Sequence, residues 1–203
     1  MKRKTRLICL IGQLGNGGTE RQLYLFLKHL DRGRYRPSVV VSSKSGGSRW
    51  EKQIRDELDV PVKFLGDLPK AAKLAKFAWT VLKDKADVVF SWSFYTNAFC
   101  MACPGTKFIG SLRGDLMTAK TQISASNFRY SLKPKCFVVN SRYLADELKL
   151  EGVSEDRISV IYNIFSPDDA FCEVRRAEDC RRVRQEYNIP QDAIVVAGVG
   201  RSS

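Results

Sequence analysis

The stretch LIGQLGNGGTER, which runs from Leu10 to Arg21, decides the fold. It follows an apolar run that begins at Leu7, which predicts a first β-strand. It precedes apolar residues at helical spacing, namely Leu23, Phe26, Leu27 and Leu30. Glycines let the backbone approach an anion, and free N–H groups at a helix N-terminus point toward it. The pattern therefore predicts a site for a nucleotide or a sugar phosphate in an α/β domain.

The loop fits neither of the two best-known phosphate-binding patterns. The dinucleotide pattern Gly-x-Gly-x-x-Gly, started at Gly15, would need its third glycine where the chain has Glu20. The P-loop pattern, started at Gly12, fails because its lysine position holds Gly18. A tight turn that binds no ligand is the alternative interpretation.

The composition is that of a globular protein, with 203 residues of which 44% are hydrophobic. Cys100 and Cys103 have the spacing of a zinc knuckle, but no second pair exists and the single histidine, His29, is distant in sequence. We therefore predict no metal site and no disulfide framework. No apolar run approaches the length of a membrane span, and the run after the basic N-terminus is too short for a secretory signal, which favours a cytoplasmic location.

Short apolar runs alternate with amphipathic stretches along the chain. Strands are expected at residues 6–11, 37–42, 60–64, 87–91, 107–111, 136–140 and 157–162. Helices are expected at residues 19–30, 49–58, 70–85, 95–103 and 141–151, and a charged helix at 173–187. This alternation predicts a Rossmann-like, doubly wound, mostly parallel sheet with helices on both faces. Ligands of such sheets bind at the carboxyl ends of the strands, which places residues 15–20, 92–97, 113–115 and Asn163 on one rim.

The end of the chain departs from this pattern. Residues 164–192 contain turn residues and the charged helix, and a strong apolar run, AIVVAG, begins at Ala193. A strand that has no partner element after it cannot bury its faces, so we expect the chain to stop just inside a second domain. A further strand on the same sheet is the alternative.

Four ordered motifs carry a resemblance to a known family. They are GGTER at 17–21, VVNSR at 138–142, RISVIYN at 157–163 and VGR at 199–201. This set resembles the retaining GT-B glycosyltransferases of the fourth glycosyltransferase family. The resemblance implies the N-terminal half of a two-domain GT-B fold: an acceptor-side domain at 1–165, a linker at 166–192 and the first strand of a truncated donor domain at 193–203. The partners that it implies are a nucleotide-sugar donor and a glycan or lipid-linked acceptor, with no cofactor.

The resemblance leaves the catalytic residue of this half unassigned. The family's acidic Glu-x7-Glu motif lies in the second domain, and the rim at 91–95 has no histidine where many members carry one. The fragment is therefore expected to be inactive alone.

Binding roles can still be assigned. The backbone N–H groups of Gly17, Gly18 and Thr19 are expected to bind the donor diphosphate, aided by the helix dipole. Residues expected at the acceptor or cleft are Glu20, Ser93, Tyr95, Asn97, Arg113 and Asn163. Two alternatives stay open: Arg113 pairs with Asp115 or another acid, and the aromatic residues at 92–95 belong to the core.

The net charge of +12 points to an anionic partner. Five lysines between Lys70 and Lys85 accompany an apolar stripe made of Ala71, Leu74, Ala75, Ala78, Val81 and Leu82. Such a helix can lie on the anionic inner face of a membrane, and a packed surface helix is the alternative. The basic residues form no nucleic-acid recognition motif, so no nucleic-acid partner is expected. A non-catalytic module that binds a nucleotide or a sugar phosphate is the other functional alternative.

Overall fold

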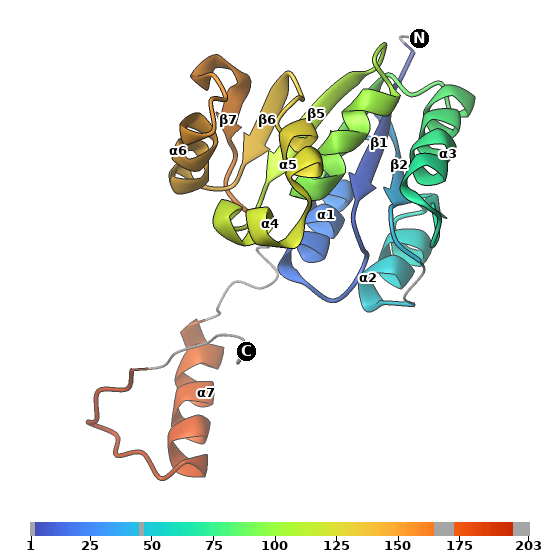
Figure 1. Cartoon of the computed structure of the whole chain (residues 1–203). Helices are drawn as coiled ribbons and strands as arrows, with labels where there is room; N and C mark the ends of the chain where they lie inside the picture. Colours follow the sequence, from blue (N-terminus) through green and yellow to red (C-terminus); the bar gives the residue numbers. More distant parts are fainter. Residues whose placement is uncertain (1–2, 45–46, 165–172, 197–203) are drawn as a thin grey trace. The chain divides into compact units, whose positions relative to one another are not determined.

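The computed structural model describes residues 3–44, 47–164 and 173–196. The chain divides into two compact units, Met1–Ile164 and Phe165–Ser203. Within these ranges the first unit contains the sheet and the second contains one helix, and each unit is described by itself (Figure 1).

The first unit is built on a parallel sheet. Within the described residues its seven strands are β1 (Thr5–Ile11), β2 (Tyr35–Val41), β3 (Val62–Phe64), β4 (Val88–Ser91), β5 (Lys107–Leu112), β6 (Cys136–Val139) and β7 (Ile158–Val160). Their spatial order is β3-β2-β1-β4-β5-β6-β7, and all of their pairings are parallel. The predicted Rossmann-like, doubly wound α/β class is confirmed.

The strand order reverses at β1. The chain moves outward from β1 to β2 and β3, then returns through α3 (Lys70–Lys83) to place β4 on the other side of β1. The connections that leave β1 and β4 therefore diverge at the carboxyl ends of these strands. Open α/β sheets bind ligands in the crevice at such a reversal.

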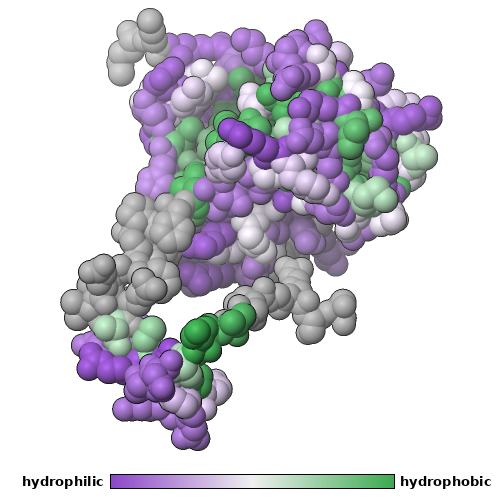
Figure 2. Space-filling model, turned by 90° about the vertical axis from the view of Figure 1, so that its left-hand side faces the viewer, coloured by the Kyte–Doolittle hydropathy of each residue, from purple (hydrophilic) through white to green (hydrophobic). Residues whose placement is uncertain are grey.

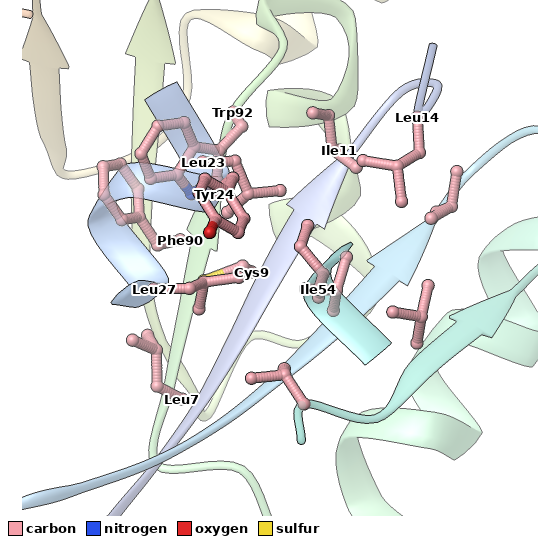
Figure 3. Close-up of a cluster of buried hydrophobic side chains, with 14 of the residues drawn as sticks. Leu7, Cys9, Ile11, Leu14, Leu23, Tyr24, Leu27, Ile54, Phe90 and Trp92 are labelled. Atoms are coloured by element: carbon pink, nitrogen blue, oxygen red, sulfur yellow. The ribbon is translucent and has the colours of Figure 1, made fainter. Parts of the chain in front are cut away.

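The two faces of the sheet bury alternate residues of β1. Leu7, Cys9 and Ile11 pack in one cluster with residues of α1 (Gly18–His29) and of η1 (Gln53–Glu57), a π-helical continuation of α2 (Arg49–Lys52) (Figure 3). Ile8 and Leu10 pack on the opposite face with α3 and η2 (Phe94–Ala102), a 3₁₀ helix. This alternation follows from the two-residue period of a strand that is covered on both faces.

A third cluster covers β5 and β6. It contains residues of α4 (Leu116–Gln122), α5 (Ala125–Ser131) and α6 (Arg142–Leu150), and the 3₁₀ turn η3 (Glu155–Arg157) precedes β7. The sequence analysis missed α4 and α5. Both begin with a side-chain cap: Asp115 accepts a hydrogen bond from the Thr118 N–H, and Ser124 accepts one from the Asn127 N–H. Caps of this kind stabilise short helices that lack a clear periodic pattern.

The second unit contains α7 (Glu173–Glu186). The Arg184 guanidinium donates hydrogen bonds to the carbonyl oxygens of Pro190 and Ala193, which ties the segment after α7 back to the helix. No strand is present at 193–196, where the expected strand begins, and residues 197–203 lie outside the described residues. Ile194, Val195 and Val196 are exposed, and Figure 2 shows a strongly hydrophobic strip in this unit.

Candidate functional site

The glycine-rich loop connects β1 to α1 at the point where the strand order reverses. Its last residue, Gly17, is the N-cap of α1 and has an extended backbone (φ −86°, ψ 176°) with no side-chain cap. The first N–H groups of a helix have no partner within the helix, so they need an acceptor from outside. This helix start can therefore receive an anion, as expected for Gly17, Gly18 and Thr19.

Glu20 folds back onto the glycine loop. Its side chain is only 6% exposed, and its Oε1 accepts a hydrogen bond of 3.4 Å from the Gly15 N–H. A Cβ atom on Gly17 would lie 2.5 Å from Glu20 Oε2, so a side chain at this position would displace the Glu20 carboxylate. By contrast, no atom lies within 4 Å of the place where a Cβ of Gly18 would be. The Gly18 side of the loop is therefore the open side for an incoming anion.

Ser93 and Tyr95 join the glycine loop to the segment that follows β4. The Gly12 N–H donates a hydrogen bond of 3.0 Å to Ser93 Oγ. The Tyr95 hydroxyl packs so closely over Gly12 that a Cβ there would lie 1.5 Å from the phenol oxygen. Burial, reinforced by the charge of Glu20, raises the pKa of Tyr95, so the phenol stays protonated and can donate a hydrogen bond at neutral pH. The structure thus brings Ser93, Tyr95 and Glu20 together at the loop.

Asn97 was expected in the cleft and lies below it. Its side chain is fully buried; Nδ2 donates to the Ser111 carbonyl at 3.0 Å, and Oδ1 accepts from the Ser111 N–H at 3.1 Å. In a 3₁₀ helix residues three apart lie on one line, and Asn97 follows the buried Phe94 on that line. Asn97 therefore joins η2 to β5, and we leave it out of the candidate site.

Arg113, just after β5, stacks on Trp92, with its guanidinium carbon 4.0 Å from the ring centroid. The alternative of an ion pair with Asp115 is wrong, because Asp115 caps α4 and no acid in the described part of the chain pairs with Arg113. Arg113 Nε is buried without a hydrogen-bond partner. Burial lowers the pKa of Arg113 to about 10, so the group stays charged at neutral pH.

The Cys9 thiol, which interacts electrostatically with Arg113, does not neutralise this cation. Burial raises the pKa of the Cys9 thiol to about 12, so Cys9 is uncharged at neutral pH. Trp92 itself belongs to the core, where it packs against Phe26 and Phe90. Figure 3 shows Trp92, Phe90 and Cys9 within that cluster. The core therefore supports a guanidinium at the rim that still lacks an anion, and guanidinium groups pair well with phosphates and carboxylates.

Asn163 closes the rim beyond β7. Its Oδ1 accepts a hydrogen bond of 3.4 Å from Asn140 Nδ2, which links the segments that follow β6 and β7. The next residue, Ile164, is held by Gln22 of α1. Gln22 Nε2 donates to the Ile164 carbonyl at 2.9 Å, and Gln22 Oε1 accepts from the Ile164 N–H at 2.6 Å. The sequence pattern does not predict this role of Gln22, because an amide at a helix surface carries no signal of a partner that is 142 residues away.

No group of three or more metal-ligating side chains comes together in the described ranges. The candidate residues at the rim offer backbone N–H groups, hydroxyl groups, the Glu20 carboxylate, the Arg113 guanidinium and the Asn163 amide.

The model of the family described as Glycosyltransferase Family 4 matches residues 16–169. The chain belongs to this family. The match begins inside the glycine loop and confirms the resemblance carried by the ordered motifs. A search of curated proteins found no significant match.

Solved structures support the family's fold. HepE from Anabaena, in complex with UDP, is 17% identical with a TM-score of 0.66, and the match covers 91% of this chain and 50% of HepE. A glycosyltransferase from Rickettsia africae is 20% identical with a TM-score of 0.59, and the match covers 94% of this chain and 51% of the Rickettsia chain. The lipopolysaccharide outer core galactosyltransferase WaaB, in its apo form, is 13% identical with a TM-score of 0.63. The match covers 80% of this chain and 46% of WaaB. The chain thus spans about half the length of these GT-B proteins.

Proposed function

We propose that this chain is the acceptor-side half of a retaining glycosyltransferase. The enzyme would move a sugar from a nucleotide-sugar donor to a glycan or lipid-linked acceptor. The observation that carries the proposal is the uncapped N-terminus of α1 behind a glycine-rich loop, at the reversal point of the sheet. Membership of the family supports it, and HepE, a structural neighbour, was crystallised with UDP and with UDP-glucose.

The glycine loop would act on the leaving group. Departure of the nucleoside diphosphate increases negative charge on its phosphate oxygens. The N–H groups of Gly17, Gly18 and Thr19, at the positive end of α1, would stabilise that charge. Glu20 would keep the loop in shape through Gly15, and the open Gly18 side would admit the diphosphate.

Arg113 would act on the acceptor. An unpaired guanidinium held rigidly against an indole ring is prepared to receive a phosphate or a carboxylate, because little side-chain freedom is lost on binding. Ser93, Tyr95 and Asn163 would contribute hydroxyl and amide groups along the same rim. We assign no catalytic residue to this half.

A second domain would supply the rest of the donor site. The matched structures are about twice as long as this chain, which supports a donor domain that begins near residue 193 and continues outside these 203 residues. The test is a transfer assay with UDP-sugars on the 203-residue chain and on a protein that includes the second domain. Turnover by the longer protein alone is the expected result. Equal turnover by the 203-residue chain would contradict the two-domain mechanism.

The outer face of α3 favours attachment of the protein to the anionic inner face of the cell membrane. Phe77 and Val81 of this helix are buried, whereas Trp79 and Leu82 are 64% and 71% exposed, and the exposed Lys83 follows them. The predicted apolar stripe is therefore corrected: Val81 faces the core, and Trp79 belongs to the outer face. No helix in the described ranges combines the length and apolarity needed to cross a bilayer. Exposed aromatic and basic residues on one helix face are typical of an interfacial helix.

Vesicle sedimentation tests this attachment. Binding is expected to rise with the fraction of anionic lipid, to fall with salt, and to weaken in Trp79→Ser and Lys83→Glu. Met117→Ser, which changes an exposed residue of α4, serves as the control. Lys76 is unsuitable for this test because its ammonium donates to the carbonyl oxygens of Phe64 and Leu65, at 3.1 and 3.0 Å. Equal recovery with neutral and anionic vesicles would argue for an enzyme that acts away from the membrane.

A further inference from the structure

A groove of about 590 Å³ lies on the sheet face covered by α3 and η2, and Tyr95 is the one residue of the candidate site that lines it. Its walls come from the start of α3 and from the turn between α4 and α5. Figure 1 shows the green η2 segment between the yellow α5 and the teal α3, and both of these helices contact η2. The groove thus runs along the molecule beside the candidate site.

The 3₁₀ winding of η2 forms the floor. Residues three apart share one side of such a helix, so Tyr95, Ala98 and Met101 form a row, and all three line the groove. Tyr95 stands at one end of this row and packs over Gly12 of the glycine loop. A ligand in the groove would therefore reach the place where the donor is proposed to bind.

The α3 wall is positively charged. Lys70 and Lys73, from the first turn of α3, both line the groove, and the ammonium group of neither makes a hydrogen bond or ion pair in the described part of the chain. Pro69 gives α3 no side-chain cap, and the first turn of α3 contains no acid. No aspartate or glutamate lines the groove. Two ammonium groups beside an uncapped helix start favour an anion.

The rest of the lining is largely apolar. Phe99 and Leu74 contribute to it, and the exposed side chains of Leu68, Met101 and Tyr130 continue it toward solvent. A small anion such as a free sugar phosphate would leave this surface in water. A ligand with a hydrocarbon chain would bury it and gain the corresponding hydrophobic free energy.

We infer that this groove binds a chain-bearing phosphate, with the phosphate at Lys70 and Lys73 and the chain along Phe99, Met101 and Tyr130. The inference rests on the proposed function in one respect: it assigns the acceptor to the class of anionic amphiphiles. The binding itself can be measured without a donor and without sugar transfer.

The test is calorimetric titration of the 203-residue chain with dodecyl phosphate below its micellar concentration. Saturable binding is expected, and the dissociation constant should rise at least tenfold in the double variant Lys70→Gln/Lys73→Gln. Met101→Glu, which places an acid at the exposed end of the row, should also weaken binding. The controls are Lys52→Gln/Lys107→Gln, which removes the same charge from exposed lysines elsewhere, and Met117→Glu, and both should bind as the native chain does.

Three results would overturn the inference. One is an unchanged affinity in the Lys70 and Lys73 double variant, and another is an equal loss in the lysine control. The third is inorganic phosphate or glucose 1-phosphate binding as tightly as dodecyl phosphate, which would identify a site for a soluble anion. None of these results bears on turnover of a nucleotide-sugar by the two-domain protein, so failure of the groove and failure of the proposed function are distinguishable.

Discussion

Arg113 combines two properties that a stable core avoids in a single side chain: its guanidinium is largely buried, and it lacks an anionic partner. The contact with Trp92 contributes about 2 kcal/mol, which is less than the cost of about 3–5 kcal/mol for an uncompensated charge in such a place. Functional sites commonly retain groups that reduce stability. Arg113 therefore fits a binding role better than a structural one.

Replacing Arg113 should separate stability from activity. Arg113→Met is expected to raise the free energy of unfolding by about 1 kcal/mol, because the unpaired charge is removed and the apolar stem is kept. Transfer to an anionic acceptor should fall in the two-domain protein. Thermal unfolding and the KM for the acceptor are the measurements.

Arg157→Met is the matched control. The Arg157 guanidinium donates to the carbonyl oxygens of Leu132 and Pro134, the former at 3.1 Å, so its loss should lower stability by about 2 kcal/mol. If Arg113→Met also unfolds more easily and leaves the acceptor KM unchanged, Arg113 is a structural residue.

The sequence predicts which residues follow each strand, and it does not predict where they point. Gly17, Gly18, Ser93 and Tyr95 follow strands that meet at one edge, so their grouping could be expected. The orientation of Asn97 could not, because a helical period and a 3₁₀ period place it on different sides of η2. The absence of a partner for Arg113 depends on Asp115 being used as a cap, which only the structure shows.

Among the elements, α1 has two roles, one in its first turn and one in the turn that follows. Its first turn forms the anion-binding end, and Gln22, one turn later, holds both backbone groups of Ile164. Ile164 also packs against the core cluster beneath α1. The point where the first unit ends is therefore attached to the helix that carries the glycine loop.

Gln22→Met should loosen this attachment while it preserves the length of the side chain. Loss of two hydrogen bonds is expected to cost about 1–2 kcal/mol of stability, and the Ile164 amide should exchange its hydrogen faster. Gln122→Met, on the exposed end of α4, is the control and should change neither quantity. Unchanged exchange at Ile164 in the Gln22 variant would mean that core packing alone holds the residue.

The long helices and the strands could be predicted because apolar residues recur in them with a clear period. The short helices α4 and α5 could not, since their formation depends on the caps at Asp115 and Ser124 and on packing against β5 and β6. The stretch at 95–103 was expected to be an ordinary helix and is wound as 3₁₀ over 94–102. That difference creates the row of side chains that floors the groove.

For the whole molecule, the alternation of strands and helices predicts a parallel sheet but not the order of its strands. The reversal at β1 requires the return of the chain through α3, and it brings the segments after β1 and β4 together. The first unit is thus a complete Rossmann-like layer with a rim prepared for anions. The matched structures are about twice as long as this chain, and in the proposed two-domain enzyme each half would contribute one side of the cleft.

The central claim is that the glycine loop binds the donor diphosphate through its backbone, and Gly18→Val in the two-domain protein tests it most directly. Gly17 is unsuitable because a side chain there would collide with Glu20, whereas a side chain at Gly18 enters open space and should leave the fold intact. A side chain at Gly18 would block the approach of the diphosphate, and a lost donor of this kind costs about 3 kcal/mol. The transfer rate is expected to fall roughly a hundredfold, while Gly105→Val, at a glycine with equally open surroundings away from the rim, should keep the native rate. A folded Gly18→Val enzyme that transfers sugar at the native rate would contradict the account.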